Sequence, residues 1–296
     1  MPLEHVSFLT RPQLDRPSLI CAFRGWNDGG EAATTAARYL AESWRARPIG
    51  YLDPEEFFDF QVTRPTVRME AGVSRVIEWP RGEFAAASPE GHDVVVFISG
   101  EPNVRWRTFA GEIIGAAKEL DVGLLATLGG FLADVPHRRP VPVVGSAHTE
   151  ETAASLGLSH SQYEGPTGIT GVLHDAANRA GLPSVSLWAA VSHYLPGTPN
   201  PKAALALARR ASALLEVPVD TAPLEHAVQE WEHEVDQVLS ENEELAEYVR
   251  RLEAIADTSF SSGGADQRSS LAGEPVPSGE SIAAELERYL REHGGS

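Results

Sequence analysis

Several loops of this sequence carry polar side chains that could do chemistry, and each of these loops follows an apolar run. The first has the G-x-x-x-x-G spacing of a phosphate-binding loop at positions 25–30. A lysine and a serine or threonine should follow, but Glu31 and Ala32 stand there. A carboxylate in the place of the phosphate-pairing ammonium argues against an ATP site. We favour a tight turn with a helix cap, in which Asp28 accepts from the first amides and Glu31 reaches back. The alternative is a turn that holds Asn27 or Asp28 at a ligand.

Two later loops offer an acid–base pair and a group of arginines. Asp134 and His137 are spaced as an acid and a base could be, or as parts of a polar loop that holds itself together. Arg105, Arg138 and Arg139 could form a local anion pocket, or could lie in solvent or at an interface. Both interpretations of each group stay open at this level.

A glycine–proline–glycine segment gives the strongest loop signal. Glu164 stands beside the sequence Gly-Pro-Thr-Gly at positions 165–168, whose glycines and proline restrict the backbone shape just before a predicted helix. A helix N-terminus attracts an anion, and a carboxylate of the same chain can take the place of a ligand there. His193 ends another apolar run, where it either faces a ligand or caps the core.

No known catalytic motif completes these loops. The motifs G-x-S-x-G, H-E-x-x-H and G-x-G-x-x-G do not occur, and the lone Cys21 excludes a disulfide framework and a cysteine-based zinc site. His226, Glu230 and His233 are spaced for a solvated helix face. We therefore assign no catalytic residue and expect neither a metal nor a cofactor. The candidate ligand pocket comprises Trp26, Asn27, Asp28, Glu101, Asn103, Arg105, Asp134, His137, Glu164, Thr167 and His193.

Four apolar runs, at 18–23, 93–98, 123–128 and 184–189, must position these loops. Two of them lack the alternation of half-buried strands, which is typical of parallel strands covered on both faces. Helical spacing of apolar residues indicates helices at 31–45, 107–120 and 168–180, and Asn200-Pro201 opens another. The sequence predicts a three-layer α/β fold with a mainly parallel sheet, and ligands of such sheets bind at the carboxyl ends of the strands.

Additions to this core, expected over residues 1–215, follow from changes of pattern. Residues 60–80 alternate as an inserted β-hairpin, whose exposed Val67 and Trp79 favour self-association. Residues 216–258 form an acidic helical arm or lid, and the span 216–257 holds thirteen acids and two arginines. A 4-3 apolar repeat with Asn242 as its polar member favours packing of this arm on its own core over pairing between chains. A Ser-, Gly- and Pro-rich linker at 259–279 and a terminal amphipathic helix at 280–296 complete the prediction.

Composition excludes several classes of function. The chain has 296 residues, with 42 acidic residues against 24 lysines and arginines, which gives a formal charge of −18. Such a polyanion repels nucleic acid and anionic membranes. The first ten residues lack the pattern of a signal peptide, and no apolar run approaches the roughly 20 residues that span a bilayer. We expect a cytoplasmic protein that binds neither nucleic acid nor membrane.

Four phrases of the sequence resemble the bacterial branch of the proteasome assembly chaperone two family, over roughly residues 15–255. They are FRGWND at 23–28, LADVPH at 132–137, YEGPTG at 163–168 and SLWAA at 186–190. The resemblance implies a core like that of nucleoside phosphorylases, a hairpin for oligomer contacts, often in a trimer, and a helical C-terminal segment near the pocket. It supplies no catalytic residues. The chaperones' terminal tail, a hydrophobic residue, Tyr and any residue, is absent, because the chain ends in Gly294-Gly295-Ser296.

Two functions follow from these observations. The favoured one is a non-catalytic binding or assembly-scaffold protein that forms a homo-oligomer, with a trimer expected. A proteasome core particle is then a candidate protein partner, although the missing tail weakens it. The alternative is an enzyme that acts on a small anionic or nucleoside-like compound in the pocket at the sheet edge, with the helical arm as its lid.

Overall fold

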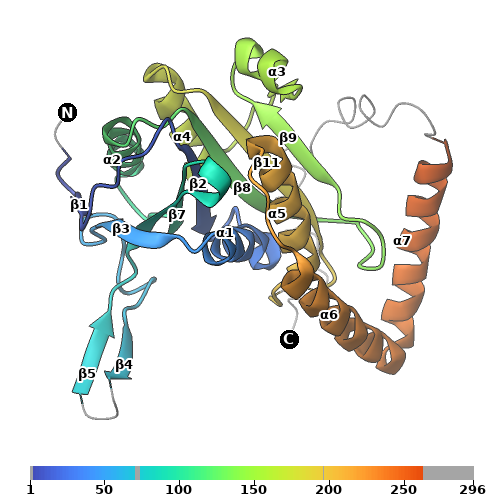
Figure 1. The fold of residues 1–296 in the computed structure, drawn as a ribbon. Coiled ribbons are helices and arrows are strands. Elements are labelled where there is room, and N and C mark those ends of the chain that lie inside the picture. Colours follow the sequence, from blue (N-terminus) through green and yellow to red (C-terminus); the bar gives the residue numbers. More distant parts are fainter. Residues whose placement is uncertain (1–2, 71–73, 196, 263–296) are drawn as a thin grey trace.

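A computed structural model describes residues 3–70, 74–195 and 197–262, with side chains up to residue 257. Its centre is a run of four parallel strands within one large mixed sheet (Figure 1). In spatial order they are β7 (Val94–Gly100), β2 (Ser18–Arg24), β8 (Leu124–Ala133) and β11 (Ser184–Ser192). The four apolar runs thus form the predicted strands, and their carboxyl ends meet at one edge.

Helices cover both faces of this sheet and give the predicted three layers (Figure 1). Helices α2 (Trp106–Glu119) and α4 (Ile169–Arg179) pack on one face, and α1 (Ala32–Ser43) and α5 (Pro201–Leu215) pack on the other. Along β2, Cys21 and Phe23 belong to the α2 side, whereas Ile20 and Ala22 belong to the α1 side. Both faces of the strand are buried, which explains its apolar run without alternation.

The sheet is wider than the sequence indicated. Strands β6 (Gly82–Ala87), β3 (Arg47–Leu52) and β1 (Val6–Phe8) extend it beyond β7 through antiparallel pairs. Strand β9 (Val143–Ala147) pairs antiparallel with β11, and β10 (Ser159–His160) continues beside it after the short helix α3 (Glu150–Leu156). These outer strands are short, and several are partly exposed, so they lack the strong apolar signal of the central four.

The predicted hairpin forms a separate two-stranded sheet that projects from the core (Figure 1). Its strands are β4 (Thr66–Glu70) and β5 (Ser74–Glu78), and its turn lies outside the described residues. Val67, Met69 and Ile77 are each more than half exposed. Trp79 is 46% exposed and packs edge-on against Phe60, with the ring centroids 4.9 Å apart.

The helical arm consists of α6 (Ala222–Glu241) and α7 (Glu243–Ser262). The two helices are separated at Asn242, which adopts an extended backbone and whose Oδ1 accepts a hydrogen bond from Leu245 N at 3.0 Å. Leu224 and Val228 of α6 are buried in the core of α1 and α5. The start of the 4-3 apolar repeat therefore packs on the core of its own chain, which is the packing favoured from the sequence.

The C-terminal residues differ in part from the sequence prediction. Residues 259–262, placed in the linker by their composition, instead continue α7, because an existing helix adds one hydrogen bond for each residue that joins it. The rest of the linker and the terminal helix at 280–296 lie outside the described residues. In the part of the chain that the structure describes, no helix is long and apolar enough to cross a membrane.

Candidate functional site

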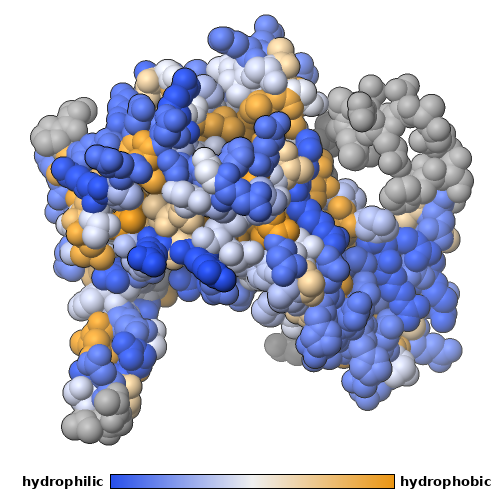
Figure 2. All heavy atoms as spheres, in the orientation of Figure 1, coloured by the Kyte–Doolittle hydropathy of each residue, from blue (hydrophilic) through white to orange (hydrophobic). Residues whose placement is uncertain are grey.

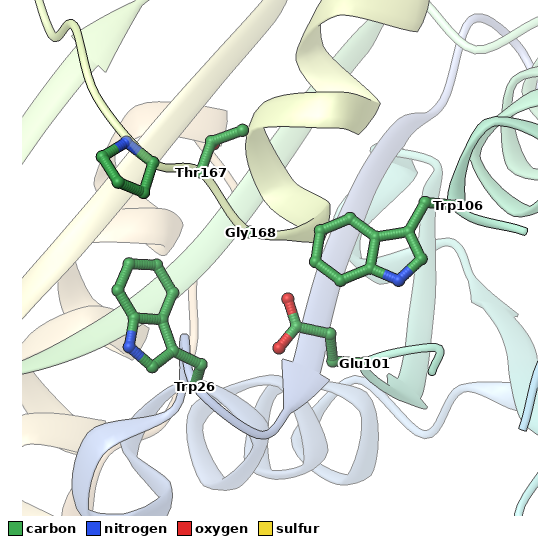
Figure 3. A pocket seen from close by; sticks show the side chains of 6 residues that line it. Trp26, Glu101, Trp106, Thr167 and Gly168 are labelled. Carbon is green, nitrogen blue, oxygen red and sulfur yellow. The ribbon is translucent and has the colours of Figure 1, made fainter. Parts of the chain in front are cut away.

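A hollow of about 180 Å³ lies at the carboxyl edge of the sheet, between the ends of β2 and β7 and the loop before α4 (Figure 3). Its walls are two indole rings, one carboxylate and the proline-containing loop. The lining residues are Trp26, Glu101, Trp106, Pro166, Thr167 and Gly168. Three of them, Trp26, Glu101 and Thr167, belong to the pocket predicted from the sequence.

Glu101 is the polar centre of this hollow. Its Oε1 accepts hydrogen bonds from Asn27 Nδ2 at 3.0 Å and from Ile169 N at 2.9 Å. The second bond occupies the N-terminus of α4 with a carboxylate of the same chain, which is one of the two alternatives that the sequence left open. Glu101 Oε2 accepts no hydrogen bond from any residue in the described ranges.

Asn27 lies behind this carboxylate and is 1% exposed. Its Oδ1 is buried and accepts no hydrogen bond within the described part of the chain. The amide packs against Gly168, where a Cβ atom would lie only 2.5 Å from Asn27 Nδ2 and 2.9 Å from Glu101 Oε1. Glycine at this position therefore lets the loop approach the carboxylate closely.

The two tryptophans flank Glu101 on opposite sides, and its carboxylate points between them (Figure 3). Trp106 Nε1 donates to Pro102 O at 2.6 Å, which fixes the orientation of its ring. Trp26 is 59% exposed, an unusual position for a large apolar side chain. Above them, Tyr163 donates its hydroxyl hydrogen to Pro166 O at 2.7 Å and holds the loop in shape.

Asp28 does not reach the hollow, because it serves as a structural cap. Its Oδ1 accepts from Ala33 N at 2.8 Å and Thr34 N at 3.2 Å, and its Oδ2 accepts from the Thr34 hydroxyl at 2.6 Å. Burial raises the pKa of Asp28, and these hydrogen bonds from Thr34 and Ala33 oppose the shift. The capping interpretation is thus supported for Asp28. Glu31 is exposed and makes no side-chain hydrogen bond within the described ranges, so a reciprocal capping box does not form.

Asn103, Arg105 and Glu164 also lie outside the hollow. Asn103 Oδ1 accepts from Asp59 N at 2.8 Å and so fastens the loop after β3. Arg105 forms an ion pair with Glu56, so its charge is engaged by a neighbouring acid. Glu164 is exposed to solvent.

The remaining predicted residues form a second cluster, at the ends of β8 and β11, where they meet the arm. His193 Nδ1 lies 3.0 Å from Asp134 Oδ1. The Tyr248 hydroxyl of α7 donates to Asp134 Oδ1 at 3.0 Å and lies 3.3 Å from His193 Nε2. Both predicted groups are thus joined to a side chain of the arm, and neither lines the hollow.

His137 belongs to the same cluster and is 2% exposed. Its Nδ1 lies 2.8 Å from the Tyr194 hydroxyl, and its Nε2 lies 3.2 Å from Asp236 Oδ1 on α6. Burial lowers the pKa of His137, and the hydrogen bond with Asp236 opposes that shift. Lys202 of α5 donates to His137 O at 2.6 Å. The imidazole thus sits between the core and α6.

The neighbouring arginines complete the attachment of the arm. Arg138 binds Asp236 Oδ1 at 2.7 Å, and Arg139 makes two bonds of 2.7 Å to the carboxylate of Asp257 on α7. We call the contacts of Asp134, His137, Arg138, Arg139 and His193 with α6 and α7 the arm clamp. Of the two alternatives left open for the arginines, the structure does not favour a shared anion pocket, because each of the three forms an ion pair with an acidic side chain of the same chain.

The sequence missed parts of both places. Trp106, Pro166 and Gly168 line the hollow but were not selected, although Trp106 directly follows the loop after β7. The partners of the clamp on α6 and α7 were not identified, because they lie 55 to 118 positions along the chain from the clamp residues that they contact. In the described ranges, no three histidine, cysteine, aspartate or glutamate side chains are grouped as a metal site requires.

The sequence of this chain matches the model of a known protein family. The family model described as the PAC2 family matches residues 22–239, from the end of β2 through the hollow to near the end of α6. The chain belongs to the PAC2 family. No curated protein matches it.

Two solved structures of PAC2 proteins are similar over most of their length. One is a PAC2 family protein from Streptomyces avermitilis, with 44% identity, a TM-score of 0.73 and coverage of 79% of this chain and 99% of that one. The other is a proteasome-assembly chaperone homologue from Mycobacterium tuberculosis, with 46% identity, a TM-score of 0.70 and coverage of 78% and 99%. The more distant PbaB of Pyrococcus furiosus, an archaeal proteasome activator, shares the fold, with 19% identity, a TM-score of 0.62 and coverage of 79% and 97%.

Proposed function

We propose that this PAC2 protein is a non-catalytic binding or assembly-scaffold protein that acts as a homo-oligomer, with a trimer favoured. Its protein partner in this proposal is a proteasome core particle. The proposal draws on the similarity to the Mycobacterium tuberculosis relative, a proteasome-assembly chaperone homologue. The expected likeness of the core to nucleoside phosphorylases also stays a proposal, supported by the parallel strands with helices on both faces.

The observation that carries the proposal is the projecting hairpin. Four large apolar side chains, at Val67, Met69, Ile77 and Trp79, are 46–59% exposed on or beside its strands. Figure 2 shows hydrophobic residues among the hydrophilic ones on this projection. A narrow two-stranded sheet cannot bury such groups by itself, and exposed apolar groups gathered in one place indicate a protein contact.

The residues that could have supported catalysis favour the same conclusion. Asp28 caps α1, and Asp134, His137 and His193 take part in the arm clamp. The hollow retains one carboxylate, Glu101, which already accepts two hydrogen bonds from its own chain. An acid–base mechanism needs a pair of groups facing the reacting atoms, and the hollow offers no such pair. The alternative of an enzyme for an anionic or nucleoside-like compound is therefore not favoured.

The arm enters this proposal as a fixed surface. Its helices carry eleven acidic residues and two arginines, a net charge of −9 that is half of the formal −18, and Figure 2 shows them as hydrophilic over nearly all of the visible face. Because the clamp ties both helices to the core, we propose that the arm presents a constant acidic surface to a partner. Such a surface attracts a basic partner and speeds its association.

Co-sedimentation with an intact proteasome core particle tests the proposal. The full chain should sediment with the particle, and a variant with Ile77→Glu and Trp79→Glu should lose most of this binding while it keeps its thermal unfolding temperature. An unrelated protein of similar size and negative charge serves as the control for non-specific binding. Equal recovery of the full chain and the acidic control would remove the link to the proteasome.

A further inference from the structure

The hollow at the edge of the sheet has the chemistry of a site for an organic cation. Glu101 is the only charged residue among its six lining residues. Its carboxylate points between the rings of Trp26 and Trp106 (Figure 3). Aromatic faces attract a cation through their quadrupole, and tryptophan does so best. A carboxylate between two indoles therefore selects a positive group and disfavours an anion.

Glu101 is held in place with one oxygen left for a ligand. Its Oε1 is engaged by Asn27 and by the backbone of Ile169, and these two bonds fix the plane of the carboxylate. Its Oε2 accepts no hydrogen bond from the described residues and is a site for an N–H donor. The orientation is fixed before binding, so a ligand does not have to order this side chain.

The aromatic walls are also prepared for a flat or round cation. Trp106 uses its Nε1 in a 2.6 Å bond to Pro102 O, so its N–H is engaged within the chain while the indole ring lines the hollow. Trp26 is 59% exposed and gains from being covered. The volume of about 180 Å³ is below the roughly 300 Å³ at which pockets for drug-sized molecules begin. This size suits a single side chain or a small amine and is too small for a nucleoside.

We propose that the hollow formed by Trp26, Glu101 and Trp106 binds a guanidinium or alkylammonium group. This chemistry has two sources, the side chain of an arginine or lysine on a protein and a free small amine. The formal charge of −18 attracts either one to the surface. The proposal does not depend on the proteasome as partner, because it is drawn from the hollow alone.

Fluorine NMR of the full chain labelled with 5-fluorotryptophan tests this directly. The protein has six tryptophans, and the variants Trp26→Phe and Trp106→Phe assign the two resonances of the hollow. The probe is N-acetyl-arginine amide, with N-acetyl-citrulline amide as a neutral control of the same shape, both at about 0.15 M salt to screen the general acidity. We expect saturable shifts of the Trp26 and Trp106 resonances with the arginine probe in the millimolar range, and none with citrulline. The resonance of Trp79, on the hairpin, should not move.

Three variants separate a cation site from a merely apolar hollow. Glu101→Gln keeps the acceptor for Ile169 N but loses the charge, and should weaken binding about tenfold or more. Trp26→Phe keeps an aromatic face and should retain most of the binding, whereas Trp26→Leu keeps only an apolar wall and should lose it. Because Trp26 is exposed, neither change threatens folding, and thermal unfolding confirms this.

The probes also distinguish the two sources. Tighter binding of the arginine probe than of tetramethylammonium indicates bonds to Glu101 Oε2 and a protein side chain as the ligand. Equal or tighter binding of tetramethylammonium indicates a small free amine. The proposal is overturned if citrulline binds as well as arginine, if Glu101→Gln leaves the affinity unchanged, or if no resonance of the hollow shifts. The co-sedimentation result stands apart from these outcomes, since it tests the hairpin.

Discussion

The exposed apolar side chains of the projecting hairpin determine how strongly copies of this chain should associate. Its side chains Val67, Met69 and Ile77 expose 59%, 52% and 52% of their surface, and Trp79 exposes 46%. Complete burial of an aliphatic side chain is worth about 1.5–3 kcal/mol, so covering the exposed half of each of the three contributes about 1 kcal/mol. Covering the exposed part of a tryptophan adds roughly 2–3 kcal/mol at about 25 cal/mol per Å². A contact between copies thus gains about 5–6 kcal/mol from each hairpin.

A gain of this size is comparable to the lower estimates of the cost of bringing two molecules together, about 4–15 kcal/mol. We therefore expect the hairpin to support self-association, and we expect a single substitution in it to weaken that association strongly. Ile77→Glu removes about 1 kcal/mol of apolar gain and adds the cost of desolvating a carboxylate, so the dissociation constant should rise at least tenfold to a hundredfold. Sedimentation velocity over a range of micromolar concentrations measures this shift.

Val238→Glu is the matched control, because Val238 is 53% exposed on α6 and away from the hairpin. It should leave the association unchanged. A parent protein that stays monomeric over the whole range would refute the reasoning. So would equal loss of association in both variants, since that outcome places the contact on the arm or on overall charge.

Three further predictions concern the groups that the fold uses structurally. Asp28→Ala removes three hydrogen bonds at the start of α1 and should cost about 2–3 kcal/mol, a fall of roughly 5–10 °C in the unfolding temperature by calorimetry, whereas Asp28→Asn should cost less. Burial lowers the pKa of His174 well below its ordinary value, so below about pH 6.5 the unfolded chain binds a proton that the folded chain does not. The free energy of unfolding therefore decreases as the pH is lowered through that range. His174→Gln should reduce the dependence of this free energy on pH by up to about 1.4 kcal/mol per pH unit, as measured in urea titrations. Arg139→Ala removes the paired bonds to Asp257 and should speed hydrogen exchange of α7 by up to about fivefold while the central strands keep their rates.

An exposed ion pair on α4 supplies the control for two of these predictions. Asp175 and Arg179 form an exposed pair on its surface, so Asp175→Ala and Arg179→Ala should change the unfolding temperature and the exchange of α7 very little. For the pH slope, the parent protein at pH 8 gives the reference at which the histidine is neutral in both states. An Asp28→Ala protein as stable as the parent, an unchanged slope in His174→Gln, or an unchanged α7 in Arg139→Ala would each contradict its prediction.

The core of the fold was readable from the sequence because its signals are local. Runs such as Val94-Val95-Val96 have no polar member to turn toward water, so strands buried on both faces follow directly from their composition. The cap of α5 was equally local, and Asn200 Oδ1 does accept from Ala203 N at 2.9 Å. The outer strands were missed because β1 and β10 contain three residues or fewer, and their pairing depends on the neighbours that the fold brings beside them.

The candidate site was predicted less well for a physical reason. Strand topology brought the loops to the same edge, but it does not tell whether a polar side chain there faces a cavity or a neighbouring element. Trp26, Glu101 and Thr167 face the hollow, whereas Asp134 and His137 face helices of the arm. The deciding partners, such as Asp236, lie about 100 positions away and have no pattern that links them to the loop.

The arm covers part of the sheet edge at which ligands of open α/β sheets bind. In open α/β sheets the ligand lies beyond the carboxyl ends of the strands, where β8 and β11 end in this fold. Tyr248 of α7 already stands there, bonded to Asp134 and close to His193. A ligand at that position would have to displace Tyr248 and break its hydrogen bond to Asp134, which costs about 0.5–1.5 kcal/mol. The hollow of Trp26 and Glu101 lies at the same edge, and Glu101 is the one charged residue among the six residues that line it.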